Sequence, residues 1–298
     1  MCGIVGLFIK DKALEPRLGE LTAGMLATMC DRGPDSAGFA VYAAPSQGKT
    51  KITLQATDPA AEFAGLAGSV SRGIGADADL AIRASHAVLT VPSEKAEAAR
   101  AIIRSEHPRV RIMGTGEAIE IYKEVGYPTD VSERFDLVTM TGSHAIGHTR
   151  MATESAVTTL GAHPFSTGAD QCLVHNGSLS NHNSLRRELR KSGMTFETEN
   201  DSEVAAAYLT WRMSQGMNLG EALNKSLDDL DGFFTFVVGT KNGFGVIRDP
   251  IACKPAVMAE TDQYVAFGSE YRALANLPGI DGAKVWEPEP ATVYFWER

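Results

Sequence analysis

The chain opens with a cysteine and a glycine-spaced apolar run, since residues 2–8 read Cys-Gly-Ile-Val-Gly-Leu-Phe. If the initiator methionine is removed, Cys2 carries both a thiol and a free α-amine. That amine has an ordinary pKa of about 7.7–8.0, so part of it is neutral near pH 7 and can accept the thiol proton. The stretch predicts a self-activating nucleophile at the head of a buried strand. A cysteine beside an apolar run is more often a small core residue, so this interpretation depends on the rest of the chain.

The composition is that of a globular protein with an ample core. The chain has 298 residues, of which 44% are apolar and 22% are charged. That length suits one large domain or two ordinary ones. The formal net charge is -9, and no block of Lys or Arg stands out. Nucleic acids and anionic membranes are therefore not expected as partners.

The sequence gives no sign of a membrane span, a signal peptide or a metal centre. No apolar run approaches the roughly 18 residues of a transmembrane helix, and residues 2–9 lack the basic segment and cleavage site of a signal peptide. The four cysteines lie far apart, without a CxxC pair or histidines at metal spacing. Neither a disulfide framework nor a zinc or iron–sulfur site is indicated, and a cytoplasmic location fits best. The cysteines are Cys2, Cys30, Cys172 and Cys253.

Apolar periodicity predicts mixed helices and strands. A strand over residues 2–9 precedes a helix over 17–30, which stops at Arg-Gly-Pro-Asp in positions 32–35. Further helices are expected over 183–192 and 202–215. Strands are expected over 39–42, 52–55, 173–175, 233–238, 243–248, 256–258, 264–266 and 293–296.

The region from about 58 to 136 has a different texture and is predicted to be an insertion with local β/α alternation. We expect a helix over 94–103, a strand over 110–113 and a helix over 117–125. Two glycine-containing segments there and nearby imitate nucleotide-binding loops. Gly-Lys-Thr at 48–50 and Gly-Thr-Gly at 114–116 each lack a glycine that the phosphate or dinucleotide motif needs, so we predict no nucleotide site at either.

Six segments in order carry the chemistry of the chain. They are Cys-Gly-Ile-Val-Gly at 2–6, Arg-Gly-Pro-Asp-Ser-Ala-Gly at 32–38, Gly-His-Thr-Arg-Met-Ala-Thr at 147–153, Ala-His-Pro-Phe at 162–165, His-Asn-Gly at 175–177 and Glu-Asn-Asp-Ser-Glu-Val at 199–204. The ordered set resembles the class II glutamine amidotransferases, whose glutaminase domain is built around an N-terminal cysteine. The resemblance implies one such domain over residues 2–298, with the insertion at about 58–136. It also implies an α+β fold, the four-layer αββα sandwich of N-terminal-nucleophile hydrolases.

By this resemblance, the catalytic residues are Cys2, Asn176 and Gly177. Cys2 attacks the side-chain amide of glutamine and forms a thioester, while its α-amine passes the proton to the leaving ammonia. The Asn176 amide and the Gly177 backbone N–H are the implied donors to the negative oxygen. Read alone, Asn-Gly is also the commonest two-residue hairpin turn, so that alternative stays open here.

The resemblance also implies a set of substrate-binding residues. Arg150 fits the α-carboxylate of the substrate and Asp201 its α-ammonium group. Thr153 and His163 match positions that line the pocket, and Arg32 matches a supporting position near the nucleophile. Taken singly, Asp201 is explained as a helix cap, Arg150 as a surface residue on an edge strand, and the His163-Pro164 pair as a rigid loop element. His148 and His175 are interpreted as structural.

Several phrases resemble one subgroup, the stand-alone amidotransferase-like subunit of N-methylglutamate synthase and its glutamate-synthase-like relatives. They are Thr-Arg-Met-Ala-Thr-Glu-Ser at 149–155, Asn-Gly-Ser-Leu-Ser-Asn-His-Asn at 176–183, Arg-Asp-Pro-Ile-Ala-Cys-Lys-Pro at 248–255 and Trp-Glu-Pro-Glu-Pro at 286–290. The implied enzyme is a methylamine–glutamate N-methyltransferase or a glutamate-synthase-like enzyme. The substrate at Cys2 is then glutamine or glutamate.

This subgroup implies a hetero-oligomer. The expected partners are a β-helical subunit and a synthase subunit that carries FMN and an iron–sulfur cluster, with no cofactor or metal on this chain. The sequence shows no motif of an acceptor domain, so the synthase is expected on another polypeptide. Two other functions stay open. They are an N-terminal-nucleophile amidohydrolase acting on another amide, and a non-catalytic regulatory subunit that retains the fold.

Overall fold

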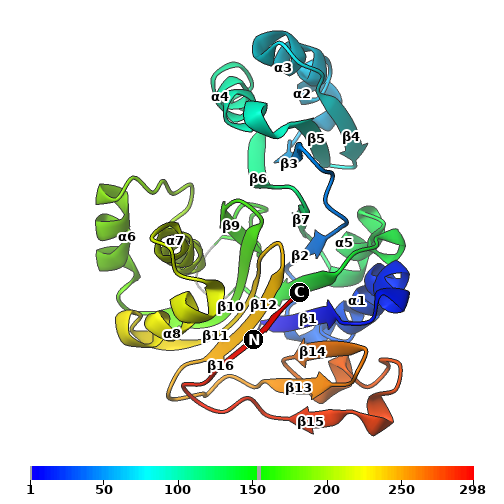
Figure 1. Ribbon diagram of the computed structural model, residues 1–298, viewed down its shortest axis with the longest axis vertical. Coiled ribbons are helices and arrows are strands. Elements are labelled where there is room, and N and C mark those ends of the chain that lie inside the picture. The colour runs from blue at the N-terminus through cyan, green and yellow to red at the C-terminus, as the bar shows by residue number, and fades with distance from the viewer. Residues whose placement is uncertain (1, 153–155) are drawn as a thin grey trace.

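The fold is built from three antiparallel sheets with helices around them (Figure 1). The computed structural model describes residues 2–152 and 156–298. Two larger sheets stack against each other, and a smaller sheet stands beside them. Short 3-10 helices join the main elements, at Lys12–Arg17, Cys30–Arg32, Ser93–Lys95, Leu137–Thr139, Tyr271–Ala273 and Ile280–Gly282.

The largest sheet has seven strands and is centred on the apolar run that opens the chain. The whole of β1 is buried, as expected of a continuous apolar strand, and it lies between β14 and β8. The strand order is β15-β13-β14-β1-β8-β2-β7. The bounds are β1 Gly3–Ile9, β2 Ser36–Tyr42, β7 Ile119–Val125, β8 His144–Arg150, β13 Val257–Glu260, β14 Tyr264–Gly268 and β15 Lys284–Trp286.

The second sheet has five strands and packs on the first through a shared apolar cluster. Ile4 and Phe8 of β1 and Ile146 of β8 meet Val174 and Phe244 from the second sheet in this cluster. The strand order is β16-β12-β11-β10-β9. The bounds are β9 Phe165–Gly168, β10 Gln171–Leu179, β11 Gly232–Gly239, β12 Gly243–Arg248 and β16 Val293–Glu297.

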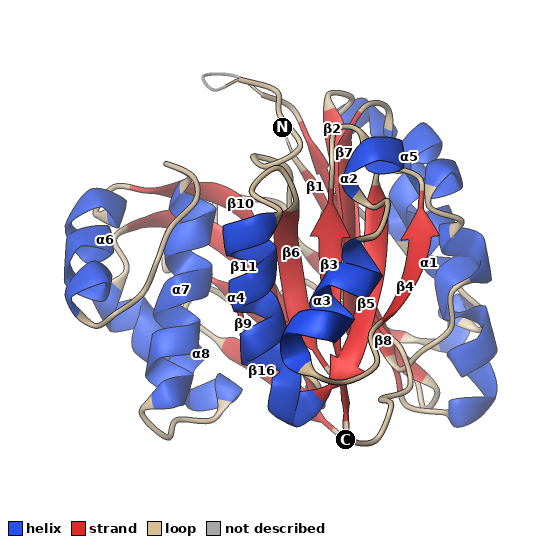
Figure 2. Ribbon diagram, turned by 90° about the horizontal axis from the view of Figure 1, so that it is seen from above, coloured by secondary structure: helices blue, strands red, loops and turns tan. Residues whose placement is uncertain are grey.

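Helices cover the outer faces of both larger sheets (Figure 2). Helices α1 (Leu18–Ala27) and α5 (Pro128–Arg134) pack on the seven-stranded sheet in one apolar cluster. Helices α6 (His182–Lys191), α7 (Asp201–Ser214) and α8 (Leu219–Asp229) pack on the five-stranded sheet in another. The predicted four-layer αββα sandwich is therefore confirmed. No helix among the described residues combines the length and apolarity needed to cross a bilayer.

The third sheet forms a separate small lobe with its own apolar cluster. Its order is β4-β5-β3-β6, and helices α2, α3 and α4 accompany it (Figure 1). The bounds are β3 Lys49–Gln55, α2 Pro59–Glu62, α3 Leu66–Ile74, β4 Asp79–Arg83, β5 His86–Pro92, α4 Ala96–Glu106 and β6 Arg111–Gly116. Strand β3 thus precedes the start of the expected insertion at about residue 58, and helices and strands alternate, although every paired strand is antiparallel.

The expected helix over 117–125 is wrong, because this segment forms strand β7 and pairs with β2 in the largest sheet. Ile119 and Ile121 face the cluster between the two large sheets, while Tyr122 joins the cluster on the outer face. Side chains that alternate between two apolar faces require the two-residue period of a strand. The alternation Ile-Glu-Ile at 119–121 agrees with this strand.

Candidate functional site

Cys2 lies just before β1, and Figure 2 shows the N-terminal end of the chain at one end of this strand. Its neighbour Gly3 pairs with Thr149 of β8. Because the two strands are antiparallel, the backbone of Cys2 lies next to that of Arg150, the last residue of β8. Cys2 is half-buried and its thiol is free. Of the other free thiols, those of Cys30 and Cys172 are buried and that of Cys253 is exposed. Burial raises the pKa of Cys172 to about 12 and also raises that of Cys30, which keeps both protonated at neutral pH.

The backbone carbonyl of Cys2 is held from two sides. Arg32 donates from Nε at 3.0 Å and Asn176 donates from Nδ2 at 3.2 Å. Arg32 is itself buried and forms an ion pair with Glu270, whose pKa is lowered chiefly by the hydrogen bond from Arg32. Arg32 lies in the 3-10 helix after α1, which covers the seven-stranded sheet, whereas Asn176 belongs to β10 of the five-stranded sheet. The nucleophile candidate is therefore fixed at the junction of the two sheets.

Asn176 and Gly177 lie within β10, paired with Thr235 and Phe234 of β11. The hairpin-turn alternative for this Asn-Gly pair is therefore wrong. Gly177 has φ of +154°, and a Cβ at this position would lie 2.0 Å from the Phe233 carbonyl oxygen. Only glycine fits such a close approach of two strands. Gly177 thus directly follows the residue that donates to the Cys2 carbonyl, at a point where β10 and β11 leave no room for a side chain.

Asp201 is the first residue of α7, but it does not cap the helix. The cap is Asn200, whose Oδ1 accepts from the Ser202 backbone N–H at 2.8 Å. The Asp201 Oδ2 instead accepts from the Leu179 backbone N–H at 2.9 Å and ties the helix to β10. Its Oδ1 lies 3.8 Å from Nδ1 of His175. The helix-cap alternative for Asp201 is therefore wrong, and its carboxylate stands near the Asn176 strand.

Ser202 joins two buried histidines beside this carboxylate. Its Oγ lies 2.8 Å from Nε2 of His163 and 2.9 Å from Nδ1 of His175. The His148 ring stacks on His163 with centroids 4.1 Å apart. The sequence did not indicate this role of Ser202, which was expected only as the first residue of the helix over 202–215.

Burial keeps these histidines neutral. It lowers the pKa of His148 to about 3, that of His163 well below its ordinary value, and that of His175 against an opposing effect of Asp201. A neutral imidazole hydrogen-bonds to Ser202 without placing a positive charge beside the Asp201 carboxylate. The structural interpretation of His148 and His175 agrees with this burial, and His163 belongs to the same cluster.

Arg150 ends β8, a strand that lies between β1 and β2. The edge-strand alternative for Arg150 is therefore wrong. The Arg150 carbonyl accepts from the Asp35 backbone N–H at 3.1 Å, and a Cβ on Gly161 would lie 3.2 Å from Nη1 of Arg150. Arg150 thus stands between the 32–35 turn and the segment that leads to His163. Thr153, the remaining predicted pocket residue, lies outside the described residues.

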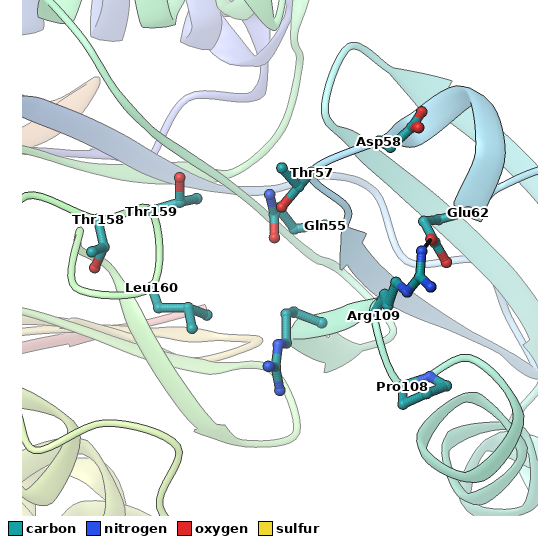
Figure 3. Close-up of a pocket in the computed structure, with 10 residues that line it drawn as sticks. Gln55, Thr57, Asp58, Glu62, Pro108, Arg109, Thr158, Thr159 and Leu160 are labelled. Atoms are coloured by element: carbon teal, nitrogen blue, oxygen red, sulfur yellow. Dashed lines mark hydrogen bonds and ion pairs between the residues drawn. The ribbon is translucent and has the colours of Figure 1, made fainter.

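A cavity of about 540 Å³ lies away from this cluster, between the small lobe and the segment that leads to His163. Gln55, Thr57 and Arg109 come from the lobe, and Thr158 and Thr159 face them from the other side (Figure 3). Cys2 does not line it. Within residues 2–152 and 156–298, no group of three or more His, Cys, Asp or Glu side chains is arranged to hold a metal ion.

Comparison with known proteins shows the family. The model described as "Glutamine amidotransferase domain" matches residues 148–276. The chain is 65% identical over 298 residues to "Glutamine amidotransferase-like protein GlxB" of Rhizobium meliloti (strain 1021), covering 100% of this chain and 99% of that protein. It is 30% identical over 181 residues to an amidophosphoribosyltransferase of Methanocaldococcus jannaschii, covering 60% of this chain and 38% of that protein. The chain therefore belongs to the family of glutamine amidotransferase-like proteins.

A solved structure supports the same fold. The glutamine phosphoribosylpyrophosphate amidotransferase from B. subtilis, complexed with ADP and GMP, is similar with a TM-score of 0.63 and 20% sequence identity. The match covers 99% of this chain and 47% of that one, so this chain spans about half the length of that enzyme. At this identity the likeness establishes the shared fold alone.

Proposed function

We propose that this chain is the glutaminase subunit of a glutamate-synthase-like complex of the N-methylglutamate synthase type. The observation that carries the proposal is the pair of hydrogen bonds that fix Cys2. Its backbone carbonyl accepts one from Arg32 and one from Asn176, at the junction of the two sheets. A nucleophile fixed beside a candidate oxyanion donor is what amide cleavage through a thioester needs.

The proposed reaction begins when the Cys2 sulfur attacks the side-chain amide carbon of glutamine. The α-amine of Cys2 takes the thiol proton and delivers it to the leaving nitrogen, so that the carbon–nitrogen bond breaks and ammonia departs. Asn176 and the Gly177 N–H stabilise the negative oxygen of the intermediate. Water then hydrolyses the thioester, which releases glutamate and restores the thiol.

Recognition of the substrate is assigned to the two ends of the amino-acid head group. Arg150 is proposed to bind the α-carboxylate and Asp201 the α-ammonium group. Thr153 and His163 are proposed as further pocket residues. The position of the Asp201 carboxylate, one hydrogen bond from the backbone of β10, supports this assignment because β10 also carries Asn176 and Gly177.

The partners belong to the proposal as well. Ammonia released to bulk water at neutral pH becomes ammonium, a poor nucleophile, so a glutaminase is useful beside its acceptor site. We propose that the acceptor site lies in a partner assembly of a β-helical subunit and a synthase subunit with FMN and an iron–sulfur cluster. The synthase subunit would use methylamine or ammonia as its amine substrate. The resemblance of segments 149–155, 176–183 and 248–255 to the subgroup supports this choice.

Covalent labelling tests the proposal. Diazo-oxo-norleucine, a glutamine analogue, should alkylate Cys2 with loss of dinitrogen, and peptide mass spectrometry should place the adduct on a chain that lacks Met1. Cys2→Ala should abolish labelling. An adduct on Cys30, Cys172 or Cys253, or saturable labelling by a penicillin-like amide instead, would favour another amidohydrolase. Absence of any specific adduct in the assembled complex would favour a regulatory subunit.

A further inference from the structure

We propose that Lys123 is a positioning residue for the substrate pocket, acting through the segment 160–164 that carries His163. Lys123 belongs to β7, within the region expected to be an insertion at about 58–136. The inference rests on the proposed function, because it assigns a role toward the same substrate. It adds a contribution to recognition from a strand in which no site residue was expected.

The Lys123 ammonium group is enclosed by backbone carbonyls. Its Nζ donates to the carbonyls of Leu160, Ala162 and Pro164 at 3.3, 2.8 and 3.2 Å. It also lies 4.5 Å from the centroid of the Phe165 ring. An ammonium group has three N–H donors, and three carbonyls match them. Among the described residues Lys123 forms no ion pair with a carboxylate, so its charge is compensated by these dipoles and the ring.

The charged groups around Lys123 favour its protonated form at neutral pH. Burial lowers the pKa of Lys123 to about 8, while Glu203 of α7 and Glu197 oppose this effect. The titratable groups facing it from other elements are His86 of β5 and His163, and burial lowers the pKa of both, that of His86 to about 3. Both imidazoles are therefore neutral near pH 7, and the ammonium keeps all three donors.

Gly38 makes room for the segment that Lys123 holds. Gly38 of β2 is the cross-strand partner of Lys123. A Cβ on Gly38 would lie 2.2 Å from the His163 carbonyl oxygen and 2.4 Å from the Lys123 Cβ. The backbone at His163 therefore lies directly over β2, beside the lysine. Gly38, which has no side chain, leaves space for the segment 160–164, and Lys123 binds the backbone of that segment.

This segment reaches the candidate site at two points. His163 contacts Ser202, the neighbour of Asp201, with Nε2 2.8 Å from Oγ. Gly161 lies against Arg150, with the Cβ position 3.2 Å from Nη1. A displaced segment would disturb the surroundings of both residues assigned to the substrate head group. Loss of the Lys123 hold should therefore weaken substrate recognition while leaving the reactivity of the Cys2 thiol intact.

Two alkylating reagents separate these effects. Inactivation by diazo-oxo-norleucine depends on recognition of the amino-acid head group, whereas iodoacetamide needs only an accessible thiol. For Lys123→Met we expect the half-saturating concentration of diazo-oxo-norleucine to rise by about tenfold or more, with the iodoacetamide rate changed by less than about twofold. Lys123→Arg, which keeps a cation with several donors, should recover part of the loss. The matched control is Lys241→Met, because Lys241 pairs with Glu117 at a half-buried site and has no contact with 160–164.

The outcomes are distinct. If wild-type chain shows no saturable labelling at Cys2, the proposed function fails and the inference about Lys123 fails with it. If wild type labels saturably and Lys123→Met matches both wild type and Lys241→Met, only the inference is overturned. Should Lys123→Met fail to fold, Lys123→Gln replaces it, because the amide keeps donors in this polar enclosure but is too short and has too few N–H groups to bind all three carbonyls. It must then raise the half-saturating concentration, and an unchanged value would overturn the inference.

Discussion

The side-chain amide of Asn176 donates to the backbone carbonyl of Cys2 across 3.2 Å, from one large sheet to the other. An amide nitrogen carries two hydrogens, so this bond leaves the second N–H for another acceptor. The same side chain can therefore hold the nucleophile and donate to an oxyanion that forms next to it. Asn176 would then both position Cys2 and stabilise the negative charge of the oxyanion.

This link predicts a large effect of Asn176→Asp. The substitution keeps the shape of the side chain but removes both donors and adds a negative charge beside the developing oxyanion. We expect kcat for glutamine hydrolysis in the assembled complex to fall by roughly 10²–10³. Asn224→Asp, on the exposed face of α8, is the matched control and should retain activity. A tenfold effect or less would argue against donation from Asn176 in the rate-limiting step.

The two head-group residues offer a test of recognition. Asp201→Asn retains an oxygen that can accept from the Leu179 N–H, so it removes the charge and leaves that hydrogen bond possible. Arg150→Lys keeps the charge and removes the planar fork. Each variant should raise KM for glutamine by about tenfold or more, with a smaller change in kcat. Steady-state kinetics with the partner subunits present would measure both constants, and wild-type KM in both variants would contradict the assignments.

Gly177 makes a prediction about stability. Gly177→Ala would place a Cβ 2.0 Å from the Phe233 carbonyl at a φ of +154°, which the strand pair cannot accommodate without moving. We expect a loss of about 2 kcal/mol or more in the free energy of unfolding. Gly24→Ala is the control, because Gly24 lies in α1 with nothing within 4 Å of the Cβ position. Urea denaturation should show that control to be neutral or slightly stabilised.

The sequence allowed the architecture to be predicted where the pattern is local. The apolar run at 2–9 predicts the buried β1, and the helix expected over 202–215 corresponds to α7, which begins one residue earlier. Strand β7 was missed because its two faces are buried by different partners, one by the second sheet and the other by α5. Each face of β7 mixes apolar and charged side chains, so the period-two pattern is interrupted and its neighbours decide its conformation.

The order of the sequence motifs made only part of the candidate site predictable. The ordered motifs directed attention to Cys2 and Asn176, which the fold brings into contact over 174 positions. They did not indicate Ser202 as the hydrogen-bond partner of two histidines, nor Lys123 as a buried cation. Both roles depend on which backbone lies nearby in space. Lys123 is buried because Gly38 and the segment 160–164 enclose it, and no spacing along the chain expresses that arrangement.

Buried neutral histidines make stability depend on pH. Burial lowers the pKa of His86, His144 and His148 to about 3 from an ordinary value of 6.5. Between these limits the unfolded chain binds protons that the folded chain does not, so the free energy of unfolding falls as the pH falls. His86 provides a clean test, because it lies between the rings of Tyr122 and Phe135 in an aromatic pocket that suits an apolar replacement.

We therefore expect the free energy of unfolding to decrease by roughly 2 kcal/mol for each of these histidines between pH 7 and pH 5. The loss begins as the pH falls below 6.5, where the unfolded imidazoles take up protons, and the folded forms resist protonation down to about pH 3. His86→Phe removes one titrating group and should shrink the pH 7 to pH 5 difference by about one histidine's share, roughly 2 kcal/mol. Urea denaturation at pH 7, 6 and 5 measures this. A difference that is equal in wild type and His86→Phe, or a wild-type stability that stays constant over this range, would show that these histidines are not held neutral by the fold.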